Sequence, residues 1–168
     1  MDRTFPLALA TARAVVRALI VLNLLVGIGI FALFVASLVA GDFVFAALGA
    51  GVANARLITV MRLIMVIGIG AAPLTHILLT RLLAIVETVR SGDPFVADNA
   101  ARLQTTAWAL LGLQLLHLAV GALSAAAQPL DLDWNFSVTG WLAVLLLFVL
   151  ARVFDHGTRM RDDLEGTV

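Results

Sequence analysis

The run ALIVLNLLVGIGIFALFVASLVA, residues 18–40, decides the fold of this chain. It holds 23 residues without a charge, and Asn23 and Ser37 are its only polar side chains. A helix needs about 20 apolar residues to cross the hydrocarbon core of a bilayer. Three further uncharged runs, 63–80, 105–128 and 134–151, have comparable lengths. The sequence therefore predicts four membrane-spanning helices.

The composition supports a membrane protein and argues against several other classes. The mean hydropathy is +1.06, and 13% of the residues are charged, about half the share of a typical soluble domain. The net charge is zero without a basic tract, so we expect no direct nucleic-acid binding. The chain has no Cys, which excludes disulfides and thiol catalysis. It also lacks a Ser–His–Asp set, a paired-carboxylate site and a phosphate-binding glycine loop. We therefore expect no catalytic residues, no metal site and no enzyme activity.

The arginines are unevenly divided between the two sides of the predicted helices. Only Arg56 and Arg62 fall on one side. The other nine are Arg3, Arg13, Arg17, Arg81, Arg90, Arg102, Arg152, Arg159 and Arg161. Cytoplasmic segments of membrane proteins are enriched in basic residues, so we expect both termini to be cytoplasmic. Every basic residue is Arg and none is Lys, which we interpret as a bacterial composition bias. We therefore expect a multi-pass protein of the bacterial inner membrane. The run 18–40 exceeds the about 7–15 apolar residues of a signal peptide, which predicts a retained anchor.

The predicted fold is all-α, an integral membrane four-helix antiparallel bundle that forms a single domain over residues 1–168. We expect the spans at about 18–40, 60–88, 104–127 and 137–155. The loop 41–56 is itself apolar and is expected to contain a short helical segment near the outer interface. A cytoplasmic tail is expected over residues 156–168.

Two interior positions depart from the apolar pattern of the spans. Asn23 lies about one turn into the first span, where its amide could hydrogen-bond to another helix. Pro73 lacks a backbone N–H and is expected to kink the second span.

His76 and His117 are the candidate ligand-binding residues within the membrane. They lie about 11 and 13 residues from the inner boundary, so their depths agree within roughly one turn. Two His side chains on adjacent helices could hold a haem iron, or a metal with Gln114 nearby. Alternatively, both are neutral packing residues with hydrogen-bond partners in the bundle. Because no further ligand spacing accompanies the pair, we expect no cofactor. A haem-binding, metal-binding or transport protein remains the alternative.

The stretch SGDPFVADNAARLQ, residues 91–104, is the most polar internal segment and is expected to form an elbow between two helices. Gly92 is suited to the left-handed conformation that ends a helix, and Pro94 prevents the helix from continuing. Asp93 precedes this proline and is expected to cap the next helix.

One face of the expected helix after Pro94 has a regular pattern. Phe95, Asn99 and Leu103 follow one another at intervals of four residues, which places them on the same side. Asp98 and Arg102 have the same spacing and are expected to form an exposed ion pair. We interpret this face as a cytoplasmic contact surface and not as an active site.

The elbow and the end of the chain resemble a known family. The motif GDPF-V-x-x-N-x-x-R-L and the ending RVFDHGTRMRDDLEGTV are similar to the bacterial membrane proteins grouped as domain of unknown function 2975. The first motif is carried by Gly92, Pro94, Phe95, Asn99 and Leu103. The second is carried by Gly157, Leu164, Glu165, Thr167 and Val168. Many relatives have Ser or Thr directly after Pro-Phe, where this chain has Val96, so we assign the helix cap to Asp93.

The resemblance implies a protein without an established catalytic activity. Such proteins are often encoded beside a small helix–turn–helix regulator, which suggests that regulator as a partner. We therefore expect a small regulatory or scaffolding protein that acts through its elbow and its tail. A homo-oligomer whose function lies in its assembly is a third interpretation.

Overall fold

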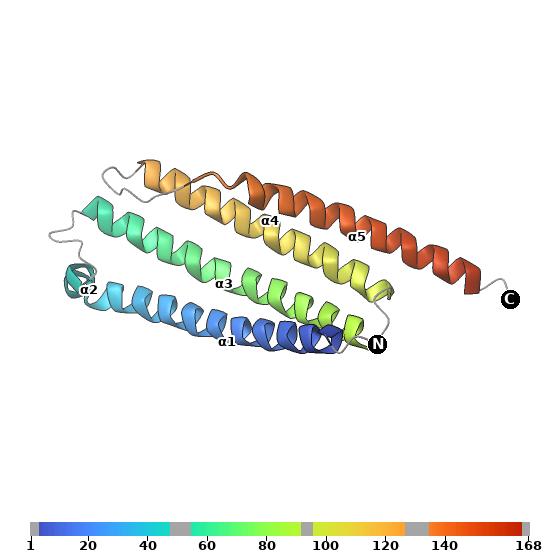
Figure 1. The fold of residues 1–168 in the computed structure, drawn as a ribbon. Coiled ribbons are helices and arrows are strands. Elements are labelled where there is room, and N and C mark those ends of the chain that lie inside the picture. The colour runs from blue at the N-terminus through green and yellow to red at the C-terminus, as the bar shows by residue number, and fades with distance from the viewer. Residues whose placement is uncertain (1–3, 48–54, 92–95, 127–134, 166–168) are drawn as a thin grey trace.

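A computed structural model describes residues 4–47, 55–91, 96–126 and 135–165 of the chain. Figure 1 shows that the described residues are organised as four long helices and one short helix. The five are α1 (Thr4–Val39), α2 (Gly41–Ala47), α3 (Ala55–Arg90), α4 (Ala97–Ala126) and α5 (Val138–Glu165). The predicted all-α fold is confirmed. The helix α2 also confirms the expected short helical segment after the first span.

The four long helices are all long and apolar enough to cross a membrane. Inside a bilayer the backbone N–H and C=O groups find no water, and a helix satisfies them internally. Each helix extends past the apolar run that predicted it, because charged side chains at the ends can reach the interface. The chain is therefore a multi-pass membrane protein. The helix α5 also continues to Glu165, so most of the predicted tail is helical.

The helices pack antiparallel in the order of the chain, as a row (Figure 1). Strong packing joins α1 to α3, α3 to α4, and α4 to α5. Among the described residues no comparable packing joins α1 to α5, so the row does not close into a ring. The long helices therefore follow the predicted up-down-up-down order, but α1 and α5 do not pack together to close the bundle. Large apolar side chains on both broad faces remain available to lipid.

The helices α1 and α3 approach each other closely at Gly27. A Cβ atom placed on Gly27 would lie 3.1 Å from the Cβ of Ala72, so glycine permits this approach. One turn earlier, the Asn23 amide donates a hydrogen bond of 3.1 Å to the Ala72 carbonyl. The predicted interhelical contact of Asn23 is confirmed. The helix α3 runs continuously through Pro73, next to this contact.

At the end of the row where α2 lies, Arg62 joins three helices. Its guanidinium donates a hydrogen bond to the Ser37 carbonyl in the last turn of α1. The same guanidinium lies 5.9 Å from the centre of the Phe45 ring on α2. Ser37 and Phe45 are both fully enclosed, with exposures of 0% and 1%. The dipole of α1 also favours a cation at this C-terminal end. Through these contacts Arg62, which belongs to α3, holds α1 and α2 in place.

Candidate functional site

The opposite end of the row is rich in ion pairs, and we call it the charged end. There α1 begins, α3 ends, α4 begins and α5 ends (Figure 1). Arg13 Nε on α1 lies 2.7 Å from Glu87 Oε1 on α3, which ties these helices together. Three further pairs lie within single helices: Glu87 with Arg90 on α3, Asp98 with Arg102 on α4, and Asp155 with Arg159 on α5.

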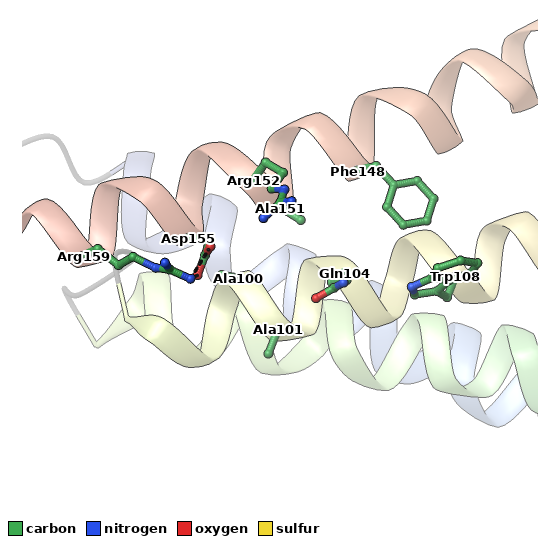
Figure 2. Close-up of a pocket in the computed structure, with 9 residues that line it drawn as sticks. All are labelled: Ala100, Ala101, Gln104, Trp108, Phe148, Ala151, Arg152, Asp155 and Arg159. Atoms are coloured by element: carbon green, nitrogen blue, oxygen red, sulfur yellow. Dashed lines mark hydrogen bonds and ion pairs between the residues drawn. The ribbon is translucent and has the colours of Figure 1, made fainter.

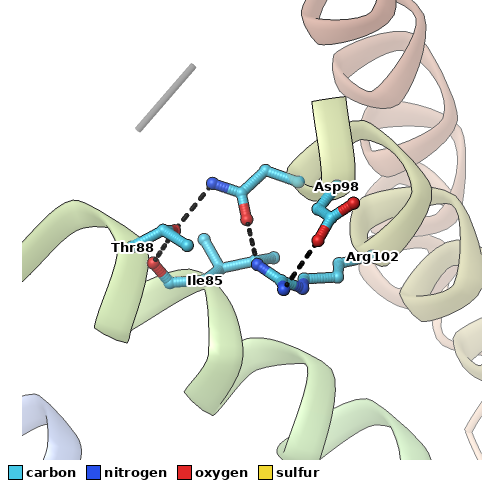
Figure 3. A network of polar contacts seen from close by, with 5 residues as sticks. Ile85, Thr88, Asp98 and Arg102 are labelled. Carbon is cyan, nitrogen blue, oxygen red and sulfur yellow. Dashed lines mark hydrogen bonds and ion pairs between the residues drawn. The ribbon is translucent and has the colours of Figure 1, made fainter. Parts of the chain in front are cut away.

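A chain of hydrogen bonds fixes the start of α4 against the end of α3 (Figure 3). The Asn99 amide donates to the Thr88 hydroxyl at 2.7 Å, and this hydroxyl donates to the Ile85 carbonyl at 2.7 Å. Arg102 donates to the Asn99 side-chain oxygen at 2.9 Å and to Asp98 at 3.3 Å. Asn99 is 0% exposed, so both its oxygen and its nitrogen are used inside the protein. The start of α4 is thus held against the end of α3 by polar contacts.

The burial of Asn99 and Leu103 corrects the expected contact surface. With exposures of 0% and 8%, these two side chains pack inward and are not available to a partner. In the described part of the elbow, the Asp98 side chain is 78% exposed, whereas that of its partner Arg102 is 22% exposed. An amphipathic spacing identifies residues on one face, but it does not tell whether that face meets another helix. The predicted residues Gly92, Asp93, Pro94 and Phe95 lie outside the described part of the chain.

A cavity at the charged end lies between α4 and α5 and has a volume of about 620 Å³ (Figure 2). It is lined by Ala100, Ala101, Gln104, Trp108, Phe148, Ala151, Arg152, Asp155 and Arg159. Trp108 and Phe148 meet edge to face, with ring centres 5.2 Å apart, at the apolar end of this lining. At the polar end, Arg159 pairs with Asp155 at 3.0 Å.

The residues of this cavity were not identified from the sequence, although a signal was present. Phe148, Arg152, Asp155 and Arg159 follow at intervals of four, three and four residues, which is the spacing of one helix face. Such a face with charges near the end of a span is also typical of membrane anchoring. Only the packing of α4 against α5 shows that this face borders a cavity.

The predicted tail motif is partly described. Gly157 lies within α5, and a Cβ atom added there would meet no other atom within 4 Å. Leu164 and Glu165 belong to the last turn of α5. Thr167 and Val168 lie outside the described residues. The motif therefore begins on a helix that continues directly from the cavity.

His76 and His117 have different neighbours in the structure. His76 lines a cavity of about 510 Å³ between α1 and α3, and its Nδ1 is buried without a hydrogen-bond partner among the described residues. His117 Nε2 instead lies 3.2 Å from the Asn135 carbonyl, which precedes α5. Gln114 packs against Gly140, where an added Cβ would lie 2.1 Å from the Gln114 Nε2. These contacts do not support the alternative in which the two histidines share one ligand.

Among the described residues, no group of three His, Asp or Glu side chains could hold a metal ion.

The chain matches the model of a family described as protein of unknown function DUF2975 over residues 45–168. The matched part includes α3, α4 and α5, and therefore both the elbow and the cavity. No curated protein and no solved structure matches the chain.

Proposed function

The chain belongs to the DUF2975 family of proteins of unknown function, and we propose that it is a membrane-embedded regulatory or scaffolding protein without catalytic activity. It would act through the charged end, where the elbow and the last helix meet the aqueous phase. In this proposal the charged end is cytoplasmic, and the membrane is the inner membrane of a bacterium.

The difference between the two ends of the helix row carries this proposal. Arg62, at the end near α2, is held by a carbonyl and an aromatic ring of its own chain. At the charged end, Asp98 and Arg159 are 78% and 72% exposed. Exposed charges on rigidly positioned helices can meet a partner without a rearrangement of the backbone. The charged end is therefore the better candidate for an interaction surface.

The cytoplasmic orientation is supported by the nine arginines on this side against two on the other. The partner that the family resemblance suggests is a small helix–turn–helix regulator. A membrane protein that binds such a regulator can hold it away from DNA without touching DNA itself. Its own lack of a basic tract is consistent with that division of roles.

The orientation can be tested by cysteine labelling, because the native chain contains no Cys. Asp98→Cys marks the charged end, and Phe43→Cys marks the other end with a side chain that is 77% exposed in the native protein. In spheroplasts, a membrane-impermeant maleimide should label Phe43→Cys, whereas Asp98→Cys should react only after the cells are opened. Labelling of Asp98→Cys from outside would contradict a cytoplasmic charged end.

The partner can be tested by co-purification of the full chain with the helix–turn–helix regulator encoded beside it. Charge reversals at the charged end, Asp98→Lys and Arg159→Glu, should weaken the complex, because complementary charges set association rates. Arg56→Glu, at the opposite end of α3, is the matched control and should leave the complex intact. A complex that survives both charge reversals, or no complex with the native chain, would refute the proposed surface.

The haem- or metal-binding alternative depends on His76 and His117 sharing a ligand. Their contacts with different helices argue against a shared ligand, but each can be tested directly. An absorbance spectrum and a metal analysis of the purified protein would identify a bound haem or metal.

A measured mass in detergent would distinguish a monomer from a homo-oligomer.

A further inference from the structure

The cavity between α4 and α5 is lined by both charged and apolar side chains. A surface that only contacts a regulatory protein would not need such a cavity. We propose that it binds the phosphate headgroup of an anionic phospholipid drawn from the surrounding bilayer. This proposal does not depend on a protein partner. It requires only that the chain spans a membrane and that Arg152 faces the cavity.

The charge of the lining favours an anion. Two guanidinium groups, Arg152 and Arg159, stand against the single carboxylate of Asp155, which leaves one positive charge. Asp155 is already paired with Arg159 at 3.0 Å. Arg152 has no ion pair or hydrogen bond among the described residues. A phosphate diester carries one negative charge and two accepting oxygens, which match the paired donors of a guanidinium.

Hydrogen-bond donors face the cavity from both helices. Gln104 on α4 is exposed and makes no hydrogen bond among the described residues, so its amide is available. Trp108, also on α4, is 60% exposed and adds an indole N–H to the lining. Together with Arg152 on α5, these groups can donate to one phosphate from opposite sides (Figure 2). Trp is enriched at the level of lipid headgroups, which is consistent with this position.

An apolar depression adjoins the cavity at Arg152. Phe148 and Arg152 line both the cavity and a neighbouring depression of about 470 Å³. This depression is also lined by Val149 and Val153, which are 52% and 60% exposed. Arg152 thus stands at the boundary between a polar cavity and an apolar depression. A phospholipid has this same division, with a phosphate at one end and acyl chains at the other.

The apolar depression is the reason to assign a lipid and not a soluble phosphate. Both ligands would offer the same oxygens to Arg152, Gln104 and Trp108. Only a lipid would also cover Val149 and Val153, and it reaches the site from within the membrane. Free phosphate would gain only the ion pair with Arg152, which is exposed to solvent, and an exposed ion pair contributes little binding energy.

The test measures the quenching of Trp108 fluorescence by brominated phosphatidylglycerol, with the full-length protein in phosphatidylcholine nanodiscs. Trp134→Phe and Trp141→Phe make Trp108 the only tryptophan. Quenching should saturate at a small fraction of phosphatidylglycerol, and brominated phosphatidylcholine at that fraction should quench less. Arg152→Ala should require roughly tenfold more phosphatidylglycerol, the effect of losing one charge-assisted interaction. Gln104→Leu should shift the titration in the same direction by a smaller factor.

Two matched variants separate a specific site from a general effect of charge. Arg81→Ala also removes an exposed arginine, but outside the cavity, and should leave the titration unchanged. Asp155→Asn raises the positive charge of the lining and should lower the required phosphatidylglycerol. Equal quenching by the two lipids, or identical titrations for Arg152→Ala and Arg81→Ala, would overturn the proposal. Reversal of the quenching by inorganic phosphate at millimolar concentration would identify a soluble anion as the ligand and refute the lipid assignment.

Discussion

The two ends of the helix row hold their charged side chains in different ways. Near α2, the guanidinium of Arg62 contacts the Ser37 carbonyl and the Phe45 ring, and both of these residues are fully enclosed. At the charged end, Asp98 and Arg159 form ion pairs within their own helices while most of each side chain stays exposed. Both ends use a cation to join helices, Arg62 near α2 and Arg13 at the charged end, but the charged end also keeps Asp98 and Arg159 accessible.

Charged side chains near α2 therefore serve mainly to stabilise the fold, whereas the exposed ones at the charged end can bind a ligand or a partner. A guanidinium that is held by enclosed groups of its own chain contributes to folding, because its hydrogen bond is charge-assisted. An exposed pair one helical turn apart contributes little to folding, and its charges remain free to meet a ligand or a partner. The start of α4 combines the two, because the buried Asn99 accepts a hydrogen bond from Arg102, which in turn pairs with the exposed Asp98. Substitutions at the two ends should therefore have very different effects on stability.

The largest loss of stability is expected for Arg62→Ala. The substitution removes a charge-assisted hydrogen bond and a cation–π contact, so the free energy of unfolding should fall by about 3 kcal/mol. Arg81→Ala, which removes an exposed arginine from the same helix, is the control and should cost less than about 0.5 kcal/mol. Reversible unfolding in detergent, followed by circular dichroism, measures both values. Equal losses would show that the Arg62 contacts do not stabilise the row.

A smaller loss is expected for Asn99→Ala at the elbow. Thr88 would lose a donor and Arg102 an acceptor, so the free energy of unfolding should fall by about 2 kcal/mol. The neighbouring Asp98→Asn keeps the buried bonds and should be close to neutral. A double-mutant cycle with Thr88→Val should show coupling, because Asn99 and Thr88 share a hydrogen bond. Strict additivity in that cycle would contradict the role of this bond.

A loss of about 1 kcal/mol is expected for Gly140→Ala in the first turn of α5. The new methyl group would collide with the end of Gln114, which must move away. Shortening the neighbour in Gly140→Ala/Gln114→Ala should restore part of the stability, because the collision is then absent. Thermal unfolding of the two single variants and the double variant provides the comparison. An additive double variant would exclude steric contact as the cause.

The smallest effect is expected for Asp155→Asn at the charged end. Its pair with Arg159 is exposed and spans one helical turn, so the free energy of unfolding should change by about 0.3–0.5 kcal/mol. The difference from the native protein should vanish in about 1 M salt, where screening acts over about 3 Å. If Asp155→Asn lowered the free energy of unfolding as much as Arg62→Ala, the two ends would not differ in how their charges contribute to stability.

Much of the secondary structure could be predicted from the sequence. The four uncharged runs correspond to α1, α3, α4 and α5, and the contact of Asn23 with another helix was anticipated. The helix α4 begins within the predicted elbow, but the orientation of its Asn99 and Leu103 face was not anticipated. Asn99 and Leu103 proved to be buried, because the face that looked suited to a partner packs inside the protein.

The candidate site was harder to predict because apolar patterning carries less information in a membrane. In water, an apolar stripe marks the face of a helix that packs against others. In a bilayer, the lipid-facing side is apolar as well, so the pattern does not distinguish lipid from a neighbouring helix. The helix α1 is apolar on all sides, and nothing in its sequence alone predicts that Gly27 meets Ala72.

The sequence by itself determined that this is an all-α chain with four helices able to cross a membrane. Long uncharged runs partition into a bilayer wherever they occur, and a helix satisfies its own backbone there. Only the tertiary structure decided the order of the row, the separate surroundings of His76 and His117, and the cavity beside Arg152. Those features depend on which helix faces meet, and this is set by close packing between side chains distant in sequence.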